Sequence, residues 1–81
     1  MKLPRDLHGE ELAKRLSRLG YQVVRQTGSH IRLTWNEGGQ EHHLTIPRHH
    51  PLKLGTLAGI LREIAEARNL TREELLKLLD L

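Results

Sequence analysis

The chain has 81 residues, with 13 Lys and Arg, 10 Asp and Glu, six His and no Cys. A chain of this length forms one small domain with a thin core, so we expect residues 1–81 to be a single domain without haem, flavin or dinucleotide. The lack of cysteine excludes disulfides, thiolate zinc sites, iron–sulfur clusters and a cysteine nucleophile. No stretch approaches the ~18 apolar residues of a membrane span. The amino terminus also lacks the apolar run of a secretory leader. We therefore expect a cytoplasmic protein with no membrane partner.

The net charge of +3 is unevenly distributed along the chain. Residues 14–62 contain eight basic and two acidic side chains and sum to +6, whereas residues 1–13 sum to −1 and residues 63–81 to −2. Five of the six histidines also lie in this basic segment: His30, His42, His43, His49 and His50. A basic segment of this kind attracts phosphate-bearing partners. Nucleic acid is the commonest such partner, and an acidic protein also fits.

The first predicted element is a helix over Glu10–Leu19, because leucines recur there at i, i+4 and i+7. Gly20 is the left-handed residue expected after its end. Asp6 and His8 compete as the residue that caps its start.

Three short strands are predicted next, at residues 21–26, 30–35 and 43–46, with a turn at 36–39. The hairpin loop has either two or four residues, and both registers place the same side chains on the same face. One face is apolar, and Tyr21 and Trp35 are expected in the core, which argues against a base-stacking platform. The other face is polar, basic and expected to be open to solvent: His30, Arg32, Thr34, His43 and Thr45.

A basic loop over 48–54 leads to a helix over 55–68, and Asn69 is the left-handed residue expected just after its end. A short last helix begins with the capping box Thr71–Glu74, and its packed residues are expected to be Leu75, Leu78 and Leu79. The order is α-β-β-β-α-α, which predicts an α+β fold with a three-stranded antiparallel sheet and helices on one face.

His30 is the strongest candidate for chemistry. It follows the flexible turn Gly28-Ser29 and begins a strand whose exposed neighbours are polar. A histidine among basic residues suits general acid–base work on RNA, because RNA carries its own nucleophile, the 2′-hydroxyl. The alternative is a histidine that only stabilises the turn. His42, His43 and His50 are expected to be ordinary surface residues, and we expect neither a metal site nor a small-molecule cofactor.

The start of the second long helix is a candidate phosphate site. Free backbone amides are expected at Gly55, Thr56 and Leu57, beside Lys53 and Arg48. The alternative is an ordinary helix start.

Several short motifs stand out along the chain: Gly20-Tyr21, the run Arg25–His30, the run Ile46–His49, and Gly55-Thr56-Leu57 with Ile60-Leu61. In their order and spacing they resemble the HicA, or YcfA-like, family of mRNA interferase toxins of type II toxin–antitoxin systems. The resemblance extends from about Gly9 to Leu79. It implies a double-stranded-RNA-binding-domain-like α-β-β-β-α fold, here with a short extra carboxy-terminal helix. It also implies a toxin that cleaves mRNA as an endoribonuclease and so inhibits translation and growth, silenced by a HicB-type antitoxin.

The resemblance makes His30 the functional histidine, and we expect a metal-independent ribonuclease with His30 as its catalytic residue. The expected RNA and phosphate contacts are Gly28, Ser29, Arg32, Arg48, His49, Lys53 and Thr56. The chain departs from the family pattern at two positions. His8 stands where a small cap residue is common. Leu54 stands where a basic or polar residue is common, so we expect Lys53 to supply the phosphate contact from one position earlier. Two alternatives are a non-catalytic RNA-binding module that uses the same face and an interaction domain for an acidic protein.

Overall fold

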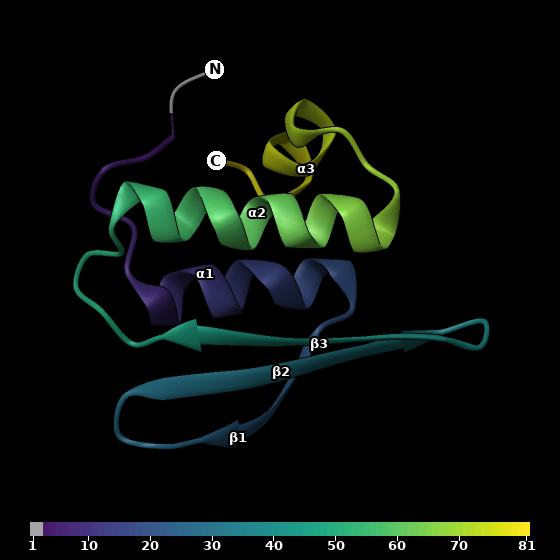
Figure 1. Ribbon diagram of the computed structural model, residues 1–81, viewed down its shortest axis with the longest axis horizontal. Coiled ribbons are helices and arrows are strands. Elements are labelled where there is room, and N and C mark those ends of the chain that lie inside the picture. Colours follow the sequence, from purple (N-terminus) through teal and green to yellow (C-terminus); the bar gives the residue numbers. More distant parts are fainter. Residues whose placement is uncertain (1–2) are drawn as a thin grey trace.

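The helices and strands follow the predicted order. In the computed structural model, which describes residues 3–81, they are α1 (Gly9–Leu16), a 3-10 turn η1 (Ser17–Leu19), β1 (Gln22–Gln26), β2 (His30–Glu37), β3 (Gln40–Pro47), α2 (Leu54–Arg68) and α3 (Arg72–Leu78) (Figure 1). The α+β prediction is therefore confirmed. The expectation about a secretory leader includes Met1 and Lys2, which lie outside the described residues.

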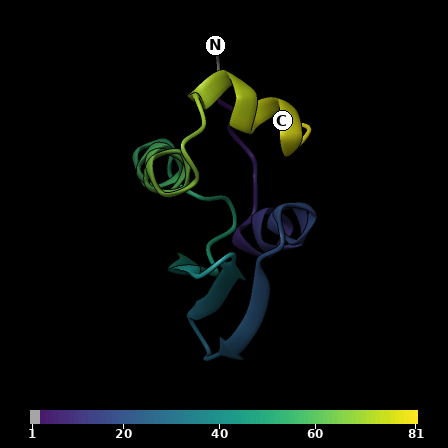
Figure 2. The same cartoon turned by 90° about the vertical axis from the view of Figure 1, so that its right-hand side faces the viewer.

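All three helices lie on one side of the sheet, and α3 lies farthest from it (Figures 1 and 2). The opposite side of the sheet has no helix over it. This arrangement buries one face of the sheet and leaves the other to solvent.

Across residues 3–81, none of the helices is both long enough and apolar enough to cross a membrane.

The sheet is antiparallel, in the order β1-β2-β3. Glu37 pairs with Gln40, so the β2–β3 loop is the two-residue alternative, Gly38-Gly39. Both glycines have positive φ, 56° and 83°, which is what the tightest hairpin turns require. The register places Ile31 opposite Ile46 and Leu33 opposite Leu44 on the buried face, as the alternation predicts.

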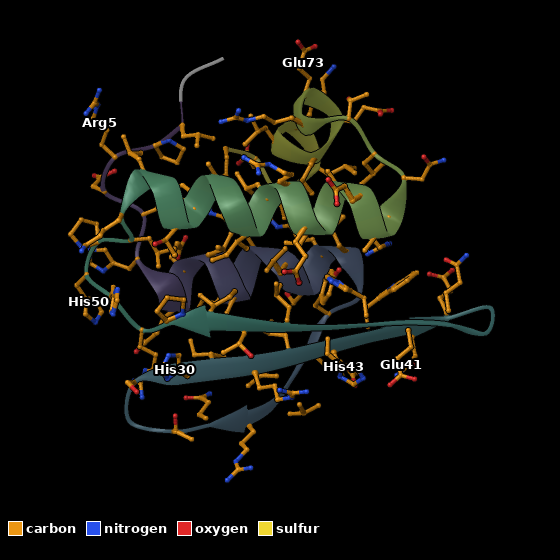
Figure 3. The ribbon with its side chains drawn as sticks, viewed as in Figure 1. Arg5, His30, Glu41, His43, His50 and Glu73 are labelled. Carbon is orange, nitrogen blue, oxygen red and sulfur yellow. The ribbon has the colours of Figure 1, made fainter. Side chains whose placement is uncertain are left out.

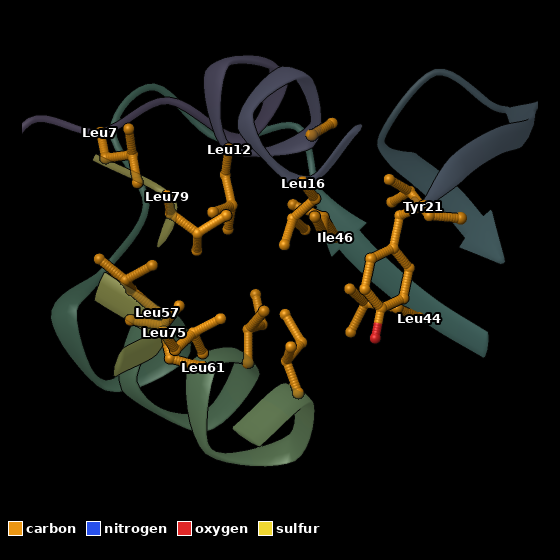
Figure 4. Close-up of a cluster of buried hydrophobic side chains, with 14 of the residues drawn as sticks. Leu7, Leu12, Leu16, Tyr21, Leu44, Ile46, Leu57, Leu61, Leu75 and Leu79 are labelled. Atoms are coloured by element: carbon orange, nitrogen blue, oxygen red, sulfur yellow. The ribbon is translucent and has the colours of Figure 1, made fainter. Parts of the chain in front are cut away.

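The core lies between the sheet and the helices (Figure 4). The predicted apolar residues of the strands and of α2 are buried there, and Tyr21 and Trp35 are buried with them. The fully enclosed side chains come from every layer: Leu12, Leu16, Ile31, Leu33, Ile46, Leu52, Leu57, Leu61, Ile64, Leu75, Leu76 and Leu79. A core of branched aliphatic residues drawn from both sheet and helices fixes the position of one relative to the other.

Helix ends differ slightly from the prediction. α1 stops at Leu16, and the chain tightens into η1, where the Ser17 hydroxyl donates to the Lys14 carbonyl at 2.6 Å. Gly20 then adopts the expected left-handed conformation, with φ 92°. His8 occupies the cap position of α1 without a side-chain capping bond, so neither predicted cap side chain fulfils that role.

α3 begins with the predicted capping box, in which Thr71 and Glu74 exchange side-chain and backbone hydrogen bonds. The prediction that Leu78 packs inward is wrong, because Leu78 is 48% exposed and Leu76 is buried in its place. Leucines at 75, 76, 78 and 79 allow two overlapping apolar faces on one helix. Packing against α2 selects the face with Leu75, Leu76 and Leu79.

Candidate nucleic-acid interface

The open face of the sheet carries the polar side chains that the alternation places there. Arg32 pairs with Thr45 across β2 and β3, and Thr34 pairs with His43. His30, Arg32, His43 and Thr45 are exposed, whereas Thr34 is half-buried. His30 lies at the end of β2 that is closest to the loop after β3, and His43 lies farther along the sheet (Figure 3). The face is therefore available to a partner.

His30 is held by the turn that precedes it. Its backbone amide donates to the Thr27 hydroxyl at 3.2 Å, and the Thr27 amide donates to the His30 carbonyl at 2.9 Å. The Ser29 hydroxyl lies 2.9 Å from Nδ1 of the His30 ring. This contact orients the imidazole through one nitrogen and leaves Nε2 for a ligand. Thr27 therefore holds the backbone of His30, and Ser29 orients its ring.

A shallow hollow of about 260 Å³ lies beside the His30 ring. Its lining contains two guanidinium groups, two hydroxyls and one imidazole, and no carboxylate: Arg25, Thr27, His30, Arg32 and Thr45. Of these, Arg25, Thr27 and Thr45 are absent from the predicted site. Thr45 lies between Leu44 and Ile46 in an alternating strand, so the sequence pattern already places it on this face. Arg25 reaches the face through an irregularity in strand pairing between Val23 and Arg25, which alternation does not show.

Arg48 links the His30 turn to α1. Its backbone amide donates to the Ser29 carbonyl at 2.9 Å, and its Nε donates to Glu10 Oε1 at 3.1 Å. This hydrogen bond, together with the positive charge of Arg48, lowers the pKa of the Glu10 carboxyl. Arg48 therefore lies next to the turn that holds His30, and its guanidinium already has an acidic partner, Glu10.

The loop after β3 is tied to the segment before α1. The Gly9 amide donates to the His49 carbonyl at 3.1 Å, and the Leu52 amide donates to the Leu7 carbonyl at 2.8 Å. His50 is exposed, as expected, but its Nδ1 lies 2.9 Å from Nδ1 of His8. These contacts place His49 and Lys53 close to the start of α1 rather than in the hollow beside His30.

The amino terminus of α2 differs from the prediction by one residue. Lys53 is the cap residue and Leu54 is the first helical residue. The Leu57 amide donates to the Lys53 carbonyl at 2.9 Å, so the prediction of a free amide at Leu57 is wrong. The amides that precede this first helical bond belong to Leu54, Gly55 and Thr56.

The buried face uses the two aromatic residues to hold α2. Tyr21 Oη lies 2.7 Å from His42 Nδ1, and His42 Nε2 lies 3.0 Å from Glu63 on α2. Arg68 of α2 stacks on the Trp35 ring, with its guanidinium carbon 3.9 Å from the ring centre. Burial raises the pKa of the Tyr21 phenol. The expectation that His42 is an ordinary surface residue is therefore wrong, because β3 turns it toward Tyr21 and α2.

These features define a small α+β protein with a basic open sheet face and one rigidly held histidine on it. A family model described as the HicA toxin of bacterial toxin–antitoxin matches residues 9–65, more than half of the chain. The chain belongs to the HicA toxin family. The match begins at the expected residue and ends within α2, so α3 lies outside it. Searches of curated proteins and of solved structures found no match.

Proposed function

We propose that this toxin is an endoribonuclease that cleaves mRNA at the open sheet face, with His30 as its catalytic residue. The observation that carries the proposal is the setting of His30. Its imidazole is exposed, oriented through Nδ1 by Ser29, and placed beside a hollow whose lining includes two guanidinium groups and no carboxylate. Such a site offers a proton acceptor for the 2′-hydroxyl and positive charge for the phosphate, and RNA cleavage uses both.

The proposed reaction begins with transfer of the 2′-hydroxyl proton to Nε2 of His30. The resulting oxygen attacks the adjacent phosphorus, and the bond from phosphorus to the 5′-oxygen of the next nucleotide breaks. That oxygen takes a proton from water or a second group, because one imidazole cannot act as base and acid at the same moment. Guanidinium groups stabilise the additional negative charge on the phosphate oxygens. The hollow is lined by Arg, Thr and His side chains and by no carboxylate, the ligand that hard divalent cations prefer. This lining supports a reaction without a metal ion.

The proposed protein partner is a HicB-type antitoxin. A protein that silences the reaction has to cover the open face, and carboxylates on its surface would complement the basic residues there. The antitoxin and RNA would then compete for the same residues.

Cleavage of RNA in excess EDTA tests the proposal. The purified toxin, free of antitoxin, is incubated with a long RNA in EDTA, and the products are resolved on a denaturing gel. We expect discrete fragments to form at the same rate with and without the chelator. Retarded migration of RNA on a native gel, with no fragments under either condition, would instead identify a non-catalytic RNA-binding module. Fragments that form only when divalent metal is restored would overturn the metal-independent reaction.

A further inference from the structure

Two arginines on the open face lie directly opposite each other. Arg25 of β1 pairs with Arg32 of β2 in the strand register, and both line the hollow beside His30. We propose that Arg25 and Arg32 together grip a single phosphate group of the RNA, the one that His30 acts beside. This inference rests on the proposed function for its ligand, and it assigns a role to Arg25, which the sequence motifs leave unassigned.

The strand irregularity is what creates the pair. Val23 is opposite Leu33 and Arg25 is opposite Arg32, so Val24 is an additional residue in β1 with no partner of its own. A β-bulge of this kind redirects the side chains that follow it. Arg25 thereby reaches the open face next to Arg32, and Val24 remains 54% exposed at the edge of the sheet.

Opposed arginines are unfavourable in the free protein. Like charges directly opposite each other across two strands repel, and the lining of the hollow has no carboxylate to neutralise them. Among the ion pairs found in residues 3–81, none includes Arg25 or Arg32, whereas Arg15 and Arg48 pair with glutamates. A bound phosphate removes the repulsion, since its two non-bridging oxygens can each accept hydrogen bonds from one guanidinium.

The position of the pair suits the proposed reaction. Thr45 lies opposite Arg32 on β3 and lines the same hollow, and His30 lies two residues before Arg32 on β2 and also lines it. A phosphate held between the two guanidinium groups is therefore next to the imidazole. The strand pairing fixes both arginine backbones, so the grip is built into the sheet rather than into a loop.

A double-mutant cycle on Arg25→Gln and Arg32→Gln tests the grip. Affinity is measured with a short 2′-O-methyl RNA, which cannot be cleaved by the proposed reaction. We expect each single variant to bind about tenfold more weakly and to lower the salt slope of binding by about 0.7. The double variant should bind little more weakly than either single one, because each guanidinium needs the other to hold the phosphate. Arg62→Gln on α2 is the matched control and should bind like the wild type.

Unfolding midpoints of the same variants provide a second readout. Both single variants should unfold at urea concentrations equal to or above that of the wild type, because either substitution removes the repulsion. Additive losses of affinity, or unchanged affinity in the single variants, would overturn the grip on one phosphate. A lower unfolding midpoint for Arg25→Gln would contradict the repulsion on which the proposal depends.

The outcomes separate this inference from the proposed function. If the wild type binds the RNA analogue through the coupled arginines but cuts no RNA in EDTA, the ribonuclease proposal fails and the grip stands. If the wild type cuts RNA in EDTA and Arg25→Gln binds and cuts normally, the grip alone fails.

Discussion

The variant His30→Ala should lose RNA cleavage by a factor of about 10² to 10⁴, the usual contribution of a positioned acid–base group. Its fold should not change, because His30 is exposed and the backbone of residue 30 keeps its hydrogen bonds with the amide and the hydroxyl of Thr27. The measurement is the initial rate of fragment formation in EDTA, with circular dichroism and a urea unfolding curve to verify the fold.

His43→Ala is the matched control for this variant. His43 is an exposed histidine on the same face, but it pairs with Thr34 farther along the sheet and does not line the hollow. We expect His43→Ala to cleave RNA at close to the wild-type rate. Equal activity of His30→Ala and the wild type would remove His30 from the reaction. Equal loss in both variants would show that the assay reports the general charge of the face.

The largest expected effect on stability comes from Gly9→Ala. A Cβ atom at Gly9 would lie 2.1 Å from the Pro47 carbonyl oxygen, and a backbone atom at the end of β3 cannot move aside cheaply. The α1 terminus has to shift, which disturbs the Gly9–His49 hydrogen bond and the Glu10–Arg48 pair beside the His30 turn. Overpacking of this kind costs about 1–3 kcal/mol or more of unfolding free energy.

Gly59→Ala is the control with the opposite expected sign. Gly59 is exposed in the middle of α2, and a Cβ there would meet nothing within 4 Å. Alanine at this position should stabilise the protein by about 0.5–1 kcal/mol, because glycine in a helix interior loses more conformational entropy on folding. Urea unfolding of both variants provides the comparison. A Gly9→Ala protein as stable as the wild type would contradict the close approach of α1 to β3.

Local signals in the sequence were sufficient for most of the fold. Strict alternation in β2 and β3 determines which side chains face the core. A register shift of one residue would turn all of these side chains to the opposite face of the sheet. The capping box at Thr71 and the left-handed residues at Gly20 and Asn69 mark helix ends through chemistry within a few positions of the chain. These features need no knowledge of distant contacts, which is why the sequence predicts them.

The missed features depend on contacts between distant segments. Arg25 joins the site through a bulge, which exists only in the pairing of β1 with β2. Arg48 pairs with Glu10 and His42 contacts Glu63, and both pairs join residues that are 20 or more positions apart. The burial of Leu76 instead of Leu78 depends on where α2 meets α3. The periodicity of the sequence does not predict these contacts between distant residues.

In the proposed reaction, the RNA supplies its own nucleophile to the face centred on His30. The most direct test is to map one cleavage position in a short RNA and to replace that nucleotide's ribose with 2′-deoxyribose, with EDTA present throughout. The proposed reaction predicts that cleavage at this position disappears while any other cleavage position in the same strand is still cut. Cleavage that continues at the deoxy position at the original rate would contradict it, because the attacking oxygen would then come from elsewhere.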